Sequence, residues 1–249
     1  MSHNYDQISA RAASKLERFS ALIKDIPYEE KGVLFSEMLF MLACLEEGSV
    51  PRILESGRAR GQSTLILAKA LPETPITSIE FNEHSPDVPI AVERLKGYTN
   101  VELLYGDARA LLPKLIQPGS VVIIDGPKMF QAIRLALTLL RTGKATQVFI
   151  HDVSRGTPER AFLDLFMPEC RYSDQRDVAL VTQVVDAAAI SHIPPHQRLD
   201  GFTGDYGYGF SLGCIPYVPG RPYGLLLVLA FIYDACGRVY RKLGRLMRR

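Results

Sequence analysis

The stretch RILESGRARGQST, residues 52–64, decides the fold of this chain. A short apolar segment runs into Glu55, a loop follows with Gly57 and Gly61, and helix-forming residues continue from Ser63. A strand, a glycine loop and a helix in this order bring the backbone close to a bound nucleotide-like ligand. By itself the motif predicts only that broad class of ligand.

Beyond the glycine loop, short apolar runs alternate with helical patterns. This alternation predicts a Rossmann-like α/β fold: a doubly wound, mainly parallel sheet with helices on both faces. The strand segments are apolar nearly throughout, as expected when both faces of a sheet are covered. Strands are predicted at 52–56, 76–81, 101–107, 120–126 and 146–153, and the helices between them at 64–71, 88–97, 110–115 and 130–143.

The flanking segments have other patterns. Apolar residues at intervals of three and four between residues 6 and 48 predict two or three helices. We therefore expect an N-terminal helical cap over 1–50, the α/β domain over 51–223 and a C-terminal amphipathic helix over 224–249.

The pattern is less regular after Asp152. Residues 157–167 predict a helix capped by Thr157, whereas 176–190 suits either a helix or a strand. The Gly-, Pro- and Tyr-rich segment 192–209 predicts a loop, and 210–218 predicts a late strand.

Composition narrows the class of protein. The 249 residues are 47% hydrophobic and 22% charged, with a net charge of +2, which is ordinary for a globular protein. From Gly224 onward there are six Arg or Lys residues and one acid, Asp234, so this segment carries about +5 and the rest about −3. We therefore expect no nucleic-acid partner for the body of the protein.

Cysteine usage and the N-terminus indicate a compartment. Cys44, Cys170, Cys214 and Cys236 form no CxxC pair, which predicts buried thiols rather than a disulfide framework or a zinc site. The first residues, MSHNYDQISARAASKLERF, contain no apolar core of a secretory signal. The sequence therefore predicts a cytoplasmic protein.

Each predicted strand ends in polar residues. Because the carboxyl ends of parallel strands meet at one edge of a sheet, these side chains are expected to surround a ligand there. Glu80 follows the glycine loop by about 20 residues, the distance at which a carboxylate binds ribose hydroxyls. The residues at the five strand ends are Glu55, Glu80, Asp107, Asp125 and the pair His151-Asp152.

This ordered set resembles the class I S-adenosylmethionine-dependent methyltransferases over roughly residues 50–153. ESGRARG stands in the place of the family's E/D-x-G-x-G-x-G, with Ala59 where the middle glycine usually stands. The chain lacks the GxGxxG of nicotinamide enzymes and has no GK[ST]. The resemblance implies S-adenosylmethionine as cofactor, held by Glu55, Gly57, Ala59, Gly61, Ser63, Glu80, Asp107, Ala108 and Asp125.

The resemblance also implies individual roles. Glu55 would support the loop and reach the amino group of the methionine portion, and Glu80 would bind the ribose. Asp107 and Ala108 would lie at the adenine edge. The alternatives are a solvated strand end for Glu80 and a turn-forming Asp for Asp107.

A finer resemblance is to catechol O-methyltransferase-like and antibiotic-sugar O-methyltransferases. It implies metal ligands at Asp125, His151 and Asp152, Mg²⁺ as the ion, and Lys128 as general base. A divalent cation would lower the pKa of an acceptor hydroxyl. Two alternatives stay open: Asp125 contacts the cofactor without a metal, and His151 itself acts as the base.

We therefore expect a methyltransferase that methylates an oxygen of a small-molecule, glycan or lipid-linked acceptor. Metal-independent N-methylation and non-catalytic S-adenosylmethionine binding by a membrane-associated protein are the alternatives. Candidate contacts to the acceptor lie in the late loop, at His192, His196, Asp205, Tyr206 and Tyr208.

The C-terminal segment predicts a helix with one apolar stripe. Its spacing alternates between four and three at Leu225, Leu229, Ile232, Cys236, Val239, Leu243 and Leu246. The continuous apolar run LLLVLAFI is too short to span a bilayer. Three interpretations remain open for residues 224–249: peripheral contact with the inner face of an anionic membrane, self-association into a homo-oligomer, or packing on the protein's own body.

Overall fold

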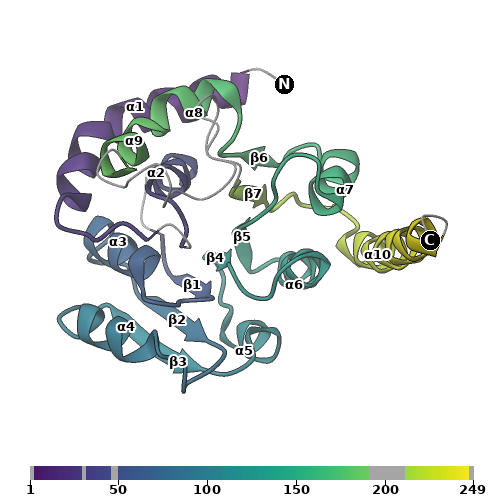
Figure 1. Cartoon of the computed structure of the whole chain (residues 1–249), viewed down its shortest axis with the longest axis horizontal. Coiled ribbons are helices and arrows are strands. Elements are labelled where there is room, and N and C mark those ends of the chain that lie inside the picture. Colours follow the sequence, from purple (N-terminus) through teal and green to yellow (C-terminus); the bar gives the residue numbers. More distant parts are fainter. Residues whose placement is uncertain (1–2, 30–31, 46–49, 191–210, 247–249) are drawn as a thin grey trace.

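The computed structural model describes residues 3–29, 32–45, 50–190 and 211–246. Its centre is a seven-stranded sheet in the order β3-β2-β1-β4-β5-β7-β6 (Figure 1). β1 to β5 are parallel, and β7 runs antiparallel between β5 and β6. The strands are β1 (Ile53–Ser56), β2 (Ile76–Glu80), β3 (Val101–Tyr105), β4 (Ser120–Ile124), β5 (Ala145–Ile150), β6 (Arg171–Tyr172) and β7 (Gly213–Pro216).

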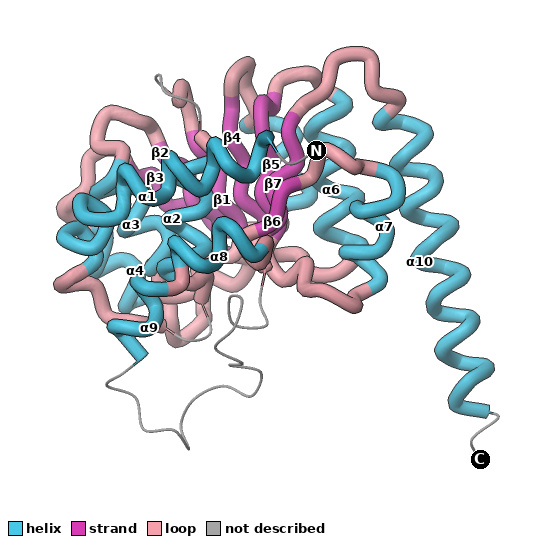
Figure 2. The backbone as a smooth tube through the Cα atoms, turned by 90° about the horizontal axis from the view of Figure 1, so that it is seen from above, coloured by secondary structure: helices cyan, strands magenta, loops and turns pink. Residues whose placement is uncertain are grey.

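Helices cover both faces of this sheet (Figures 1 and 2). One face carries α1 (His3–Ile23), α2 (Phe35–Cys44), α3 (Gln62–Ala70), α4 (Val88–Leu95), α8 (Arg176–Thr182) and α9 (Val184–Ile190). The other carries α5 (Ala108–Leu115), α6 (Phe130–Arg141), α7 (Pro158–Phe166) and α10 (Tyr223–Leu246).

The buried apolar side chains form two cores, one on each face. Consecutive residues of a strand point to opposite faces, so Ile53 joins the α1–α3 core and Leu54 joins the α5–α6 core. The first helices share a core with the sheet: Met38 and Phe40 of α2 lie in the same cluster as Ile53.

The five predicted strands and the helices between them are confirmed. Thr157 caps α7, accepting a hydrogen bond from the backbone N–H of Arg160. Segment 176–190 is helical, because its length exceeds that of a strand and α1 and α2 cover it. The late strand is confirmed as β7, whereas residues 192–209, with the five candidate acceptor contacts, lie outside the described residues.

Two sequence predictions need correction. β3 is not covered on both sides, since it is the edge strand and only partly buried. Three of the cysteines are buried as predicted, but Cys236 is exposed on α10.

Candidate functional site

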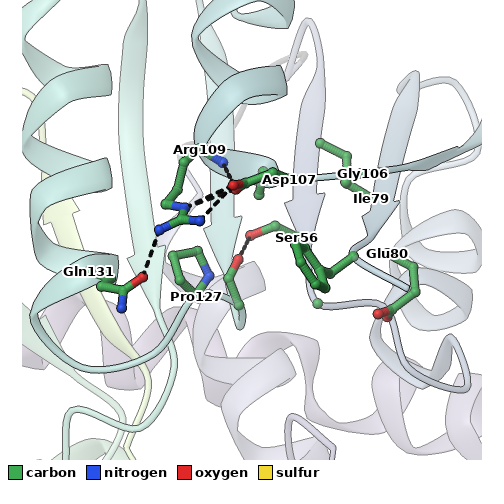
Figure 3. Close-up of a pocket in the computed structure, with 12 residues that line it drawn as sticks. Ser56, Ile79, Glu80, Gly106, Asp107, Arg109, Pro127 and Gln131 are labelled. Atoms are coloured by element: carbon green, nitrogen blue, oxygen red, sulfur yellow. Dashed lines mark hydrogen bonds and ion pairs between the residues drawn. The ribbon is translucent and has the colours of Figure 1, made fainter. Parts of the chain in front are cut away.

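A cavity of about 300 Å³ opens at the carboxyl ends of β1 to β4 (Figure 3). Parallel strands in a doubly wound sheet place ligands at this edge. The residues that line the cavity are Ser56, Gly57, Ile79, Glu80, Phe81, Gly106, Asp107, Ala108, Arg109, Gly126, Pro127 and Gln131. Four of the predicted cofactor residues are among them: Gly57, Glu80, Asp107 and Ala108.

The glycine loop closes one side of the cavity. Gly57 has a φ of +86°, and a Cβ there would lie 2.8 Å from the backbone of Asp125 and of Gly126. The loops after β1 and β4 therefore touch through a position that only glycine fills. Gly61, with φ +76°, begins α3 and packs against Leu95.

Glu80 braces the same loop. Its Oε2 accepts a hydrogen bond from the backbone N–H of Ala59 at 2.9 Å. Beside it, Phe81 lines the cavity with 71% of its surface exposed. The carboxyl end of β2 thus carries a carboxylate and, at the next residue, an exposed aromatic ring on which a planar base can stack.

Asp107 interacts with both the backbone and the side chain of Arg109. It caps α5 by accepting from the backbone N–H of Arg109, and it forms an ion pair with the Arg109 guanidinium at 2.7 Å (Figure 3). The hydrogen bonds from Arg109 lower the pKa of Asp107, so the side chain is an anion. Arg109 also donates to Gln131, which joins the walls of the cavity formed by α5 and α6.

Glu55 does not line the cavity. Its carboxyl is buried beneath α3 and accepts hydrogen bonds from the hydroxyls of Ser63, Thr64 and Ser78. Burial raises its pKa, and the three hydroxyls oppose that rise. The structure therefore places Glu55 and Ser63 as supports of the loop and the start of α3.

A second group of charged side chains lies where β4 and β5 end. Lys128 Nζ is 2.5 Å from Asp125 Oδ1 and 2.6 Å from Asp152 Oδ2. His151 Nδ1 is 2.6 Å from the same Asp125 oxygen. The loop 125–128 joins this group to the cavity, because Gly126 and Pro127 form part of the cavity wall.

Glu37 of α2 completes the group from the other side. Its Oε2 lies 3.1 Å from His151 Nε2 and accepts the backbone N–H of Leu34 at 2.8 Å. Both ring nitrogens of His151 thus face carboxylates, an arrangement that the doubly protonated imidazolium satisfies. Glu37 is only 1% exposed, and the ring of His151 is buried as well.

The pKa directions agree with this geometry. Burial disfavours the charge on His151, but Glu37 and Asp125 outweigh it and raise the His151 pKa well above its ordinary value. Burial likewise opposes the Lys128 charge, and Asp125 and Asp152 outweigh it, so the Lys128 pKa is raised. Asp125 is held anionic: burial would raise its pKa, but His151 and Lys128 lower it.

Residues with strained backbone conformations lie near the cavity and near the charged group at the ends of β4 and β5. The non-glycine residues with positive φ in the described chain are Ala59 (+46°), Met129 (+58°) and Asp152 (+65°). They follow β1, β4 and β5, so all three lie at the same edge of the sheet. Such conformations cost about 1–3 kcal/mol each and cluster at functional sites.

The predicted metal ligands meet in space. Ligand atoms of Asp125, His151 and Asp152 lie within 4.8 Å of one another. The donor set does not fit a divalent cation in this arrangement, because the Lys128 ammonium lies between the two carboxylates and both ring nitrogens of His151 face carboxylate oxygens. Lys128 and His151 instead pair with the three carboxylates of the group, Asp125, Asp152 and Glu37.

Sequence reasoning missed Glu37, Phe81, Arg109 and Gln131. Glu37 had a signal: it is the one charged residue in the apolar run VLFSEMLFMLACL. A lone carboxylate inside an apolar helix needs a partner. The predicted strand 76–81 includes Phe81, and nothing in the local sequence distinguishes this residue from a core aromatic.

No family model matches the chain. By sequence it is similar to a tRNA (guanine-N(7)-)-methyltransferase of Nitrosomonas eutropha, with 30% identity over 101 residues, 40% of this chain and 43% of that protein. The chain therefore matches less than half the length of this curated relative.

Among solved structures, the fold is similar to three methyltransferases. They are the O-methyltransferase TomG of Streptomyces achromogenes (22% identity, 81% of this chain and 89% of that one, TM-score 0.46), a precorrin-6y C5,15-methyltransferase of Geobacter metallireducens (11%, 77% and 92%, 0.48) and the Podospora anserina methyltransferase PaMTH1 (16%, 87% and 96%, 0.45).

The strand order itself carries the assignment of the fold. Five parallel strands are followed by an antiparallel β7 between β5 and β6, and the cavity lies at the carboxyl ends of the parallel strands. The chain thus has the Rossmann-like fold of class I S-adenosylmethionine-dependent methyltransferases.

Proposed function

We propose that this protein is an S-adenosylmethionine-dependent methyltransferase that methylates an oxygen atom of its acceptor. The observation that carries the proposal is the cavity at the ends of β1 to β4, which shares the loop 125–128 with the charged group of Lys128, Asp125 and Asp152. The cavity that would hold the cofactor thus lies next to side chains that can donate or accept a proton.

The residues fit the cofactor by type. Glu80 offers Oε1 toward ribose hydroxyls while its Oε2 holds the glycine loop. Phe81 gives the adenine a stacking surface, and Ala108 with Asp107 borders its edge. Gly57 lines the cavity and lets the loops after β1 and β4 come together at its wall, where the backbone can approach the methionine portion.

S-adenosylmethionine supplies an electrophilic methyl group when bound. The chain must position the acceptor hydroxyl and remove its proton. Lys128 and Asp152 are the more exposed members of the charged group, whereas His151 and Glu37 are buried. We assign orientation of the acceptor oxygen to the Lys128 ammonium, acceptance of the proton to Asp152, and positioning of Asp125 to His151.

Cofactor binding is tested by calorimetry with S-adenosylmethionine and S-adenosylhomocysteine. Glu80→Gln should weaken both by roughly tenfold or more, since a charge-assisted hydrogen bond contributes about 1.5–3 kcal/mol. Glu83→Gln removes the same charge from an exposed residue three positions along and should bind as wild type. Absence of binding to the wild-type protein would refute the methyltransferase proposal.

The role of metal is tested by chelation. Because Lys128 pairs with both candidate aspartates and His151 pairs with Asp125, we expect methyl transfer in EDTA to equal that with added Mg²⁺. Activity that disappears in EDTA and returns with Mg²⁺ would show instead that Lys128 moves aside for a cation, as in the catechol O-methyltransferase-like scheme.

N-methylation is a second candidate function. It is supported by the partial similarity to the tRNA (guanine-N(7)-)-methyltransferase of Nitrosomonas eutropha. Transfer of labelled methyl groups to bulk tRNA would support it, whereas labelling of hydroxylated glycan, lipid-linked or small-molecule acceptors, with alkali-stable ether products, would support O-methylation.

A further inference from the structure

Helix α10 has an apolar face that the described chain leaves uncovered. Leu226 and Ala230 are buried against the core of α6 and α7. On another side of the helix, Leu225, Val228 and Ile232 are 57%, 53% and 53% exposed. Phe231 is 54% exposed, with the Arg134 guanidinium over its ring. One face of this helix therefore packs in the core, and another face is exposed to solvent.

The direction of α10 follows from its contacts with α6. Gly224 lies beside Arg141 at the end of α6, Asp234 pairs with Arg134 at 2.9 Å, and the Tyr233 ring is 5.7 Å from Phe130 at the start of α6. The two helices are thus antiparallel. Because α6 begins at the carboxyl edge of the sheet, α10 runs toward that edge.

The helix continues past this edge. Cys236 and Gly237 border a hollow with Gly156 and Thr157, which follow the end of β5. Residues 238–246 extend α10 by about 14 Å at a rise of roughly 1.5 Å per residue. Figure 2 shows this last part of α10 clear of the other helices. It projects on the side where the cavity and Lys128 lie.

The sequence of the projecting part is strongly basic. Residues 235–249 contain six Arg or Lys and no Asp or Glu, while apolar spacing continues through Val239, Leu243 and Leu246. Self-association through α10 would bring two such segments together without acids to pair with them. An anionic lipid surface complements both the cations and the apolar face.

We propose that α10 docks this protein on an anionic membrane through its exposed apolar face and its basic C-terminal part. None of the described helices is long and apolar enough to cross a bilayer. Leu225, Val228 and Ile232 extend the lipid-facing side back along the body, and the basic residues of 238–246 supply the charge. This docking is independent of the proposed methyl transfer.

Co-sedimentation of the full chain with vesicles tests the proposal. Binding should be strong with phosphatidylcholine containing phosphatidylserine, weak with phosphatidylcholine alone, and reduced by salt. The variant Arg238→Gln, Arg241→Gln, Lys242→Gln, Arg245→Gln should lose at least about tenfold in partitioning. The variant Leu225→Ser, Val228→Ser, Ile232→Ser should also bind more weakly, because it removes exposed apolar area only.

A matched control removes four cations from the body. Arg18→Gln, Lys24→Gln, Lys96→Gln, Lys114→Gln changes the net charge equally at exposed sites outside α6 and α10 and should bind as wild type. Equal binding by the α10 charge variant and the wild type would overturn the proposal. So would concentration-dependent dimerisation that the apolar variant abolishes without vesicle binding, since the occupant would then be a second copy.

Discussion

At the scale of single residues, Gly57 links the first strand to the candidate site. Its positive φ turns the chain after β1, and its missing side chain allows contact with the loop that follows β4. Ala59, two positions on, takes a positive φ despite its methyl group, and Glu80 accepts its backbone N–H. One glycine is therefore indispensable, whereas alanine is accepted where a tertiary hydrogen bond holds the conformation.

Gly57→Ala should destabilise the protein by roughly 2–4 kcal/mol, since it adds a left-handed penalty to a 2.8 Å collision with backbone. Affinity for S-adenosylmethionine should fall with it. Urea denaturation and calorimetry measure the two effects. Gly97→Ala is the matched control, because a Cβ there meets nothing within 4 Å, and it should stay within about 0.5 kcal/mol of wild type. Equal stability of the two variants would contradict the packing argument.

At the scale of elements, the start of α2 rests on a buried acid from α9. Asp186 Oδ2 accepts the backbone N–H of Ser36 at 3.1 Å, while Oδ1 is buried without a hydrogen-bond partner. Burial raises the pKa of Asp186 to about 7, the contact with Ser36 lowers it, and nearby Glu37 raises it. Asp186, which binds the start of α2, and Glu37, which faces His151, are thus neighbouring acids.

A folded-state pKa above the unfolded value means that the folded protein binds more protons. The contribution of Asp186 to stability is therefore fully present below about pH 4 and is lost as pH rises through about 7. Asp186→Asn keeps an acceptor for Ser36 without the charge, so it should raise stability at pH 8 by on the order of a few kcal/mol and flatten the profile between pH 4 and 8. Thermal unfolding across this range measures both.

Asp177→Asn provides the control for this profile. It removes an exposed acid from the first turn of α8 and should leave the pH dependence as in wild type. A steep loss of stability above pH 4 that persists in Asp186→Asn would show that another group controls it.

At the scale of the whole molecule, α10 divides into a packed half and a projecting half. Leu226 and Ala230 belong to the second core, with Phe130 and Phe162 beneath Tyr233. A chain that stops after Gly237 should therefore keep its Tm within about 2 °C, whereas one that stops after Gly224 should lose about 10–20 °C through exposure of that core. Calorimetric scans of the two truncated proteins measure these Tm values. A similar fall in Tm for both would show that residues after Gly237 also pack on the body.

Much of the fold could be predicted from the sequence because its signals are local. Alternating apolar runs indicated β1 to β5, and the change to 3.6-residue spacing indicated the helices between them. The edge position of β3 was not predictable, since exposure of an edge depends on strand order. The sequence of 176–190 suits either a helix or a strand, and its packing against α1 and α2, which only the tertiary structure sets, decides for a helix.

The candidate site was predictable only in part. Gly57, Glu80, Asp107 and Ala108 line the cavity because they follow strands that end at one edge, and strand ends are visible in the sequence. Glu55 also follows that pattern, yet its side chain lies beneath α3. Alternation fixes that consecutive residues point to opposite faces, but which face each one takes depends on the register of the whole sheet.

The glycine loop, the order of strands and helices, and the basic amphipathic tail were thus determined by the sequence alone, since each depends on neighbours along the chain. The tertiary structure decided which charges meet. It brought Glu37 of α2 onto His151, placed Lys128 between Asp125 and Asp152, and directed α10 past the edge that holds the cavity. These contacts join segments up to 114 residues apart, and only packing of the complete sheet sets such distances.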